Sequence, residues 1–131
     1  MSMHAAAMVE VNEWDEKPYN EIEGEPKLTR ATVRQTYQGD IVGEGTIEYL
    51  MLYTDVNATY VGLERVIGTL AGRRGSFVLK HTGVYEDGEA RTVWTVVPGS
   101  ATGELAGLCG EGKVSQGEGR TYPITLEYDF E

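Results

Sequence analysis

Cysteine is nearly absent from this sequence, which has one, Cys109, among 131 residues. A single cysteine excludes a disulfide within the chain, and such low usage is typical of a reducing compartment, so we predict a cytoplasmic location. A nucleophilic cysteine needs an activating histidine or cation. The setting of Cys109 between Leu108 and Gly110 is instead typical of a small buried strand residue.

Metal-binding and phosphate-binding patterns are also missing. The chain has two histidines and no CxxC or HxxxH spacing, which argues against a zinc site. The glycine-rich segments Gly43–Thr46 and Gly110–Gly112 lack the lysine and the helix that a phosphate-binding loop requires. We therefore expect no metal and no cofactor.

Basic residues and long apolar runs are scarce. Lys and Arg number 11 against 21 Asp and Glu, which gives a net charge of −10. This balance disfavours nucleic acid, whose phosphates need a basic surface, and it disfavours anionic membrane surfaces. No stretch approaches the roughly 20 apolar residues of a membrane span. We therefore expect that the protein binds neither nucleic acid nor a membrane, and we interpret the excess negative charge as a source of solubility.

Proline is scarce as well, with four residues, but glycine is abundant, with 17. Glycines spread through a chain favour tight turns, bulges and bends. Eight tyrosines, two tryptophans and many threonines and valines favour strands. Hydrophobic residues alternate with a period of two, and helical periodicity is nearly absent. The sequence therefore predicts an all-β protein with a single domain, residues 1–131.

The alternating segments and the short connections between them predict eight strands in an up-and-down meander. This connectivity closes well into an antiparallel β-barrel, which leaves no exposed sheet edge. We expect a polar loop over Asp15–Pro26 and a short helical turn within Ala101–Ala106. The predicted strands are Ala5–Trp14, Lys27–Gln38, Ile41–Tyr53, Thr59–Ala71, Arg74–Tyr85, Glu89–Val97, Gly107–Ser115 and Tyr122–Phe130.

Three tight turns then set the register of the central strands. Two-residue turns are predicted at Gly72-Arg73, Asp87-Gly88 and, on weaker grounds, Val56-Asn57. Antiparallel pairing across these turns places Glu64 opposite His81, His81 opposite Trp94, and Tyr49 opposite Glu64. A turn longer by two residues slides the pairing but keeps the face, whereas a bulge reverses the face.

The same register sorts the side chains into two faces. One carries long cations with access to water and is predicted to be the outside, with Glu48, Arg65, Lys80, Arg91, Val78, Thr82 and Thr95. The other is predicted to face the barrel lumen, with Tyr49, Met51, Glu64, Val66, Leu70, Phe77, Leu79, His81, Trp94 and Val96. Valines on the outside make a lone barrel wall unusually apolar, so we expect a homodimer or larger oligomer that covers Val78, Val84, Val93 and Val97.

Glu64 and His81 are the candidate catalytic residues. A buried carboxyl and imidazole titrate jointly and can act as an acid/base unit. The residues expected to bind a ligand around them are Tyr49, Met51, Phe77, Leu79 and Trp94. The alternative is that Glu64 and His81 satisfy one another and only hold the barrel register, since buried polar groups are normally paired.

Several segments resemble a bacterial family of uncharacterised small domains. They are Val11–Tyr19, Val61–Gly68, Gly75–Gly83, Val93–Gly110 and the terminal Tyr128-Asp129-Phe130. The family resembles the barrels of allene oxide cyclase and the dirigent proteins, with which the chain shares a glycine-rich strand from Thr102 to Gly110. The resemblance implies an eight-stranded barrel with a lumen pocket, commonly a homo-oligomer. Relatives in that superfamily steer cyclisation without a cofactor, and the family offers no agreed catalytic residues.

Two functions follow as hypotheses. One is a cofactor-independent cyclase or isomerase, similar to a pericyclase of a secondary-metabolite pathway, that orients a small apolar or polyketide-like molecule in the lumen. The alternative is a barrel without catalysis, which either binds a small ligand or serves as a structural oligomer with a filled core.

Overall fold

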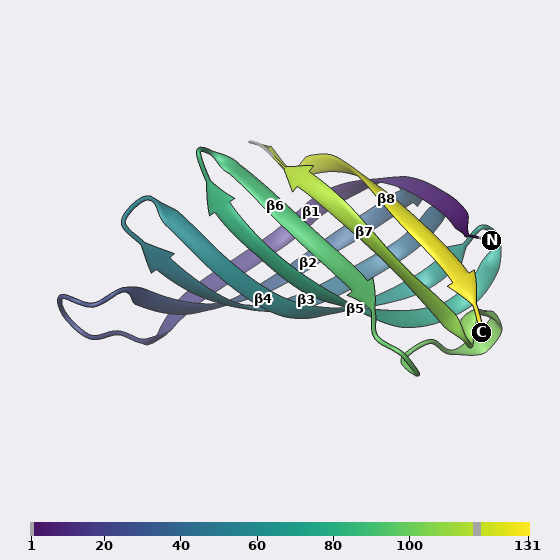
Figure 1. Cartoon of the computed structure of the whole chain (residues 1–131), viewed down its shortest axis with the longest axis horizontal. Helices are drawn as coiled ribbons and strands as arrows, with labels where there is room; N and C mark the ends of the chain where they lie inside the picture. The colour runs from purple at the N-terminus through teal and green to yellow at the C-terminus, as the bar shows by residue number, and fades with distance from the viewer. Residues whose placement is uncertain (1, 117–118) are drawn as a thin grey trace.

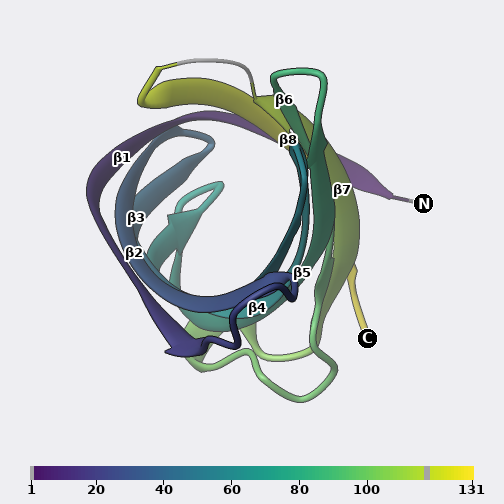
Figure 2. The same ribbon diagram turned by 90° about the vertical axis from the view of Figure 1, so that its left-hand side faces the viewer.

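The computed structural model describes residues 2–116 and 119–131, which form one antiparallel sheet. Consecutive strands pair in sequence order, and β8 pairs back onto β1, so the sheet closes into a barrel (Figures 1 and 2). This confirms the all-β class and the meander order. The strands are β1 (Met3–Asn20), β2 (Lys27–Gly39), β3 (Ile41–Thr54), β4 (Asn57–Leu70), β5 (Arg73–Glu86), β6 (Glu89–Val96), β7 (Leu108–Gln116) and β8 (Thr121–Phe130).

A short 3₁₀ helix, η1 (Gly103–Leu105), lies within the predicted helical turn and closes one end of the barrel. Its Leu105 is completely buried in the core. The amide of Thr102 donates to the carbonyl of Ser76 on β5 at 2.8 Å, which fixes this connection to the wall. No helix among the described residues has the length and apolarity needed to cross a membrane.

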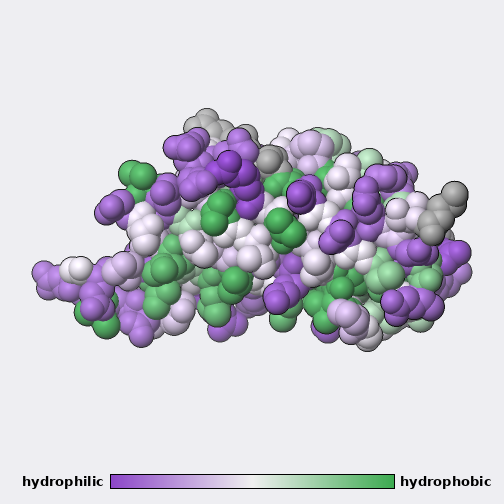
Figure 3. Space-filling model, viewed as in Figure 1, coloured by the Kyte–Doolittle hydropathy of each residue, from purple (hydrophilic) through white to green (hydrophobic). Residues whose placement is uncertain are grey.

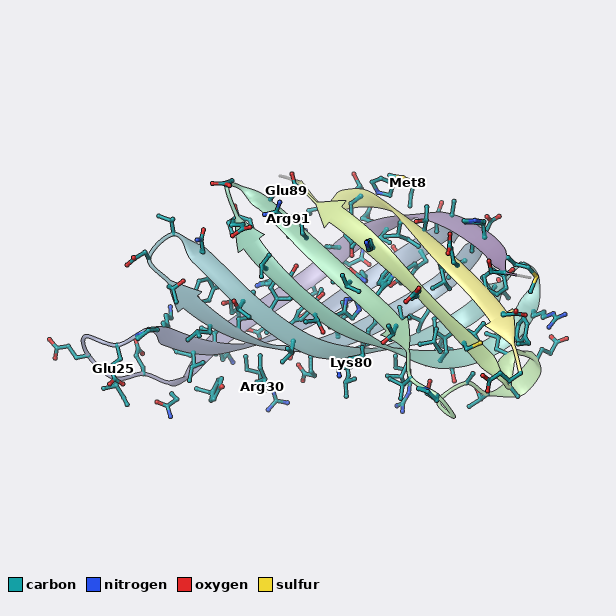
Figure 4. The ribbon with its side chains drawn as sticks, in the orientation of Figure 1. Met8, Glu25, Arg30, Lys80, Glu89 and Arg91 are labelled. Atoms are coloured by element: carbon teal, nitrogen blue, oxygen red, sulfur yellow. The ribbon has the colours of Figure 1, made fainter. Side chains whose placement is uncertain are left out.

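The predicted loop Asp15–Pro26 is wrong over its first half. β1 continues to Asn20 and pairs with β2, and together they form a hairpin that extends beyond the barrel body (Figure 1). Hydrophilic side chains cover most of its tip (Figure 3), where Glu25 points into solvent (Figure 4). Because the side chains of residues 17–27 are all exposed, this part of the sequence needs no apolar alternation, and composition alone could not distinguish it from a loop.

A β-bulge between Val11 and Glu13 reverses which residues of β1 face inward. Before the bulge the odd-numbered side chains are buried, as at Val9. After it, Trp14 pairs with the buried Val33, and Glu16 pairs with the buried Ala31. The bulge therefore directs Trp14 and Glu16 toward the lumen, which the sequence pattern did not reveal.

The predicted register of β5 and β6 is confirmed, with His81 opposite Trp94. The register of β4 and β5 is wrong by two residues: Gly62 lies opposite His81, and Glu64 lies opposite Leu79. The cause is the turn, which is Ala71-Gly72 and not Gly72-Arg73. Both turn residues have positive φ, 49° and 84°, as a type I′ hairpin turn requires.

The same displacement occurs between β3 and β4. The turn is Asp55-Val56, so Tyr49 lies opposite Gly62 and not opposite Glu64. Both pairings are displaced by two residues, which is an even number. Each side chain therefore still lies on the predicted face of the sheet. All ten residues predicted for the lumen are buried, as the sequence analysis requires.

The outer face is also as predicted. Arg30 and Lys80 point away from the barrel (Figure 4), and Glu48, Arg65, Lys80, Arg91, Thr82 and Thr95 are exposed. Among the outer valines, Val84 and Val93 are exposed, and Val78 and Val97 are half-buried. The oligomer that would cover these valines stays a prediction.

Candidate functional site

A cavity of about 310 Å³ lies inside the barrel, toward the end that carries the β3–β4 and β5–β6 turns. The opposite end is filled by the core around η1. Aromatic rings form much of the cavity wall, together with small aliphatic groups and one histidine. The lining residues are Trp14, Tyr49, Met51, Tyr53, Ala58, Tyr60, His81, Tyr85, Ala90, Thr92, Val114 and Tyr122.

Tyr49 and His81 meet across Gly62 in this wall. Gly62 pairs with Tyr49 on one side and with His81 on the other. A Cβ at Gly62 would lie 2.7 Å from the Tyr49 ring, so only glycine leaves room for the two side chains to approach. Their rings lie 5.6 Å apart, edge to face, and the Tyr49 hydroxyl is 3.5 Å from His81 Nδ1.

The candidate pair Glu64 and His81 is brought together, although the two residues are not directly opposite one another. Glu64 Oε1 lies 2.8 Å from His81 Nε2, and both side chains are almost completely inaccessible to solvent. Gly45 makes space for the carboxylate, because a Cβ there would lie 1.9 Å from Glu64 Oε2. The diagonal approach is possible because a long side chain reaches a neighbour two residues away on the same face.

Two residues of β2 hold the other carboxylate oxygen, and sequence analysis missed both. Glu64 Oε2 accepts hydrogen bonds from the Tyr37 hydroxyl at 2.6 Å and from Gln35 Nε2 at 2.9 Å. Gln35 Oε1 in turn accepts from the hydroxyl of Tyr122, which lines the cavity, at 2.9 Å. Their inward positions follow from alternation in β2, but which partner they reach depends on the curvature of the closed barrel.

These contacts fix the direction of the hydrogen bonds. With Glu64 as a carboxylate, which only accepts, His81 Nε2 carries a hydrogen and donates it to Glu64. In the neutral imidazole, Nδ1 is then an acceptor that faces the Tyr49 hydroxyl. The site is therefore a chain of three groups, with Tyr49 and His81 in the cavity wall and Glu64 buried behind them.

The other predicted ligand-binding residues lie at different depths. Met51 lines the cavity. Trp94 packs edge to face beneath His81, with ring centroids 5.5 Å apart, and is buried with Phe77 and Leu79 in the core that fills the closed end. Trp94, Phe77 and Leu79 thus support the site from below and do not line the cavity.

A second polar cluster lies near the cavity and centres on Glu16, which sequence analysis placed in a loop. Its carboxylate accepts from Trp14 Nε1 at 2.9 Å, from Thr29 Oγ1 at 2.7 Å and from the Tyr53 hydroxyl. Partial burial opposes ionisation, but these hydrogen bonds outweigh it and, with the charge of Lys27, lower the pKa of Glu16. Glu16 is therefore anionic at neutral pH.

Burial raises the pKa of the lumen tyrosines. Desolvation, followed by the nearby Glu64 charge, holds the pKa of Tyr37 well above its usual range. Desolvation likewise raises the pKa of Tyr49 and Tyr122. At the mouth, burial and the hydrogen bond to Glu16 raise the pKa of Tyr53 to about 12. These phenols stay protonated at neutral pH and can serve as hydrogen-bond donors.

This shift predicts alkaline unfolding. A folded-state pKa above the unfolded value of about 10 stabilises the protein fully below that pH and less as the pH rises through the folded-state pKa. We expect the free energy of unfolding to fall steeply above about pH 10, the unfolded-state value. Phenolate absorbance and circular dichroism recorded in one titration test this. Full ionisation of all eight tyrosines while the β-sheet signal is intact would contradict it.

Within the described part of the chain, no group of three or more histidine, cysteine, aspartate or glutamate side chains is placed to hold a metal ion. Residues 5–128 match the family model described as "Protein of unknown function (DUF3224)". The chain belongs to the DUF3224 family. A crystal structure of a DUF3224 protein of unknown function from Shewanella oneidensis MR-1 is similar over the whole chain.

That DUF3224 structure shares 31% sequence identity, with a TM-score of 0.82, and the match covers 100% of this chain and 98% of the other. The search of curated proteins found no match. Membership of DUF3224 therefore confirms the uncharacterised family that the sequence segments indicated, and it brings no activity with it.

Proposed function

We propose that this protein binds a small, largely apolar or polyketide-like molecule in the barrel lumen and catalyses its isomerisation or cyclisation without a cofactor. The observation that carries the proposal is the chain of Tyr49, His81 and Glu64, which ends in the wall of an aromatic cavity. A relation to allene oxide cyclase-like barrels, indicated by the sequence resemblance, fits this reaction class.

The proposed step is a proton shift within the substrate. His81 Nδ1 takes a proton from carbon next to a carbonyl, and the electron pair moves onto the carbonyl oxygen. Glu64 stabilises the imidazolium that forms, as a carboxylate does behind a catalytic histidine. The Tyr49 hydroxyl donates a hydrogen bond to the negative oxygen. His81 then returns the proton to a different carbon, so atoms and charge balance with no oxidant or cofactor.

The environment of each group suits its role. The raised pKa of Tyr49 keeps its hydroxyl protonated as a donor at neutral pH. Tyr37 and Gln35 hold the Glu64 carboxylate in one position, so the His81 ring is also fixed. Trp14 and Tyr60 line the cavity and restrict the conformers of a bound molecule, which contributes to catalysis by orientation.

A second candidate function is ligand binding without chemistry. Glu64 is fully satisfied by Tyr37, Gln35 and His81, and such a network can serve only to specify the barrel register. Ligand binding would then depend on the cavity and not on the state of His81.

Conversion of 3-cyclohexenone to its conjugated isomer, followed by ultraviolet absorbance, tests the proposal. We expect catalysis by the unaltered protein and a loss of about 10²- to 10⁴-fold in His81→Ala, the range for removal of an acid/base group. Glu64→Gln should lose a similar factor, because an amide N–H facing Nε2 forces the hydrogen onto Nδ1 and removes the acceptor.

Lys80→Ala is the matched control, since Lys80 is the outward neighbour of His81 on the same strand. It should leave the rate unchanged. If His81→Ala folds, binds the ketone and retains the full rate, the catalytic proposal is wrong and the binding function replaces it.

A further inference from the structure

The wall of the lumen cavity combines many aromatic rings with an absence of lysine and arginine among its described lining residues. Its aromatic rings are Trp14, Tyr49, Tyr53, Tyr60, Tyr85 and Tyr122. The faces of such rings carry negative electrostatic potential and attract cations, most strongly when water is excluded.

The rings are arranged in different planes. Tyr49 and Tyr60 lie edge to face at 77° with centroids 5.4 Å apart, and Trp14 is tilted by 32° from Tyr49 at 6.0 Å. Ring faces and edges of several orientations therefore border one cavity. This arrangement suits a compact charged group with apolar substituents better than it suits a flat planar ligand.

Two carboxylates stand behind this aromatic wall. Glu16 accepts hydrogen bonds from Trp14 and Tyr53, and Glu64 lies behind His81. Donation of a hydrogen bond to an anion makes the donating ring richer in electrons, so the faces of Trp14 and Tyr53 become more attractive to a cation. The net charge of −10 adds a long-range field of the same sign.

We infer that the molecule bound in the lumen is an organic cation: a quaternary or protonated amine with apolar substituents, whose charged nitrogen lies against the aromatic wall near Glu16. This inference rests on the proposed binding function and narrows its ligand class. Carboxylates and phosphates are disfavoured as ligands, because no described lining residue is lysine or arginine. The nearby Lys27 already lies beside Glu16, and His81 Nε2 already faces Glu64.

An adjacent, smaller cavity of about 230 Å³ shares Trp14, Tyr49 and Tyr122 with the lumen cavity. Arg120 lines this smaller cavity, but Glu13 lines it as well. The smaller cavity therefore has one positive and one negative side chain, and it adds no net positive charge next to the lumen cavity.

The fluorescence of Trp14 can report the binding of a ligand in the lumen cavity. The chain has two tryptophans, and Trp94 is buried beneath His81, whereas Trp14 is 49% exposed at the cavity. Titration of tryptophan fluorescence with benzyltrimethylammonium, and with its uncharged isostere neopentylbenzene, compares a cation and a neutral molecule of one shape. We expect the cation to bind at least about tenfold more tightly.

Two pairs of variants test which residues cause the preference for the cation. Glu16→Gln should weaken binding of the cation by about three- to tenfold at low salt, and the neutral isostere should be unaffected. Glu23→Gln makes the same change in net charge on the exposed hairpin tip and should have no effect. Tyr85→Leu should weaken cation binding and Tyr85→Phe should not, because only the second keeps the ring.

The results of these titrations separate the cation inference from the proposed binding function. Equal affinity for the two probes, or tighter binding of the isostere, overturns the cation inference and leaves the binding function intact. If neither probe quenches fluorescence or shifts the thermal unfolding temperature, both the inference and the binding function are wrong. A cation preference that Glu23→Gln reduces as much as Glu16→Gln also overturns the inference, because the overall field would then account for it.

Discussion

Glu64→Ala is expected to lower the free energy of unfolding by about 3 kcal/mol or more, because three buried donors lose their acceptor at about 1–3 kcal/mol each. The carboxylate is completely buried and accepts from Tyr37, Gln35 and His81. Its removal leaves these three donors without an acceptor in a site that water does not reach, and it opens a cavity as well. Urea unfolding followed by circular dichroism measures the loss.

Glu48→Ala is the matched control for this change. Glu48 is also a carboxylate in a strand, and it forms an ion pair with Arg30 at 3.0 Å, but on the exposed outer face. We expect a loss of less than about 1 kcal/mol, as for most surface pairs. Similar losses in the two variants would show that the Glu64 network contributes no more than a surface ion pair does.

Gly112→Ala is expected to be among the most destabilising single-methyl additions. Gly112 lies opposite Trp94, and a Cβ there would lie 1.9 Å from the indole Nε1 and 2.4 Å from the carbonyl oxygen of Thr125. Neither atom can move freely, because one belongs to a buried ring and the other to the backbone of β8. Overpacking of this kind costs about 1–3 kcal/mol or more.

The readout for Gly112→Ala combines stability with Trp94 fluorescence, since the indole has to shift. Gly24→Ala is the control, because Gly24 has a positive φ of 85° but no atom within 4 Å of an added Cβ. It tests the backbone cost of alanine at a left-handed position without any steric clash, which is about 1 kcal/mol. A Gly112→Ala protein as stable as Gly24→Ala would contradict the packing described for this wall.

Glycines make room for the side chains of the candidate site. The sequence pattern predicted that glycines shape the sheet, but it did not predict which glycine makes room for which side chain. Their abundance correctly predicted a sheet with many turns and bends. The individual roles depend on which side chains lie on the neighbouring strands. Gly62 lets Tyr49 approach His81, and Gly45 accommodates the Glu64 carboxylate. Such roles require the register of three strands at once, and moving a turn by one residue displaces every pair by two residues.

The sequence by itself determined the β class, the meander order and the inward face, because period-two alternation and short turns are local properties. It therefore placed Glu64, His81 and Tyr49 on one buried face. Only the tertiary structure decided which of them touch, because contact depends on turn geometry at Ala71-Gly72 and on barrel closure. The bulge in β1, which turns Trp14 and Glu16 inward, leaves no signature in the alternation. The partners Gln35 and Tyr37 on β2 reach Glu64 on β4 over Gly45 of the intervening β3, a contact that local pattern does not encode.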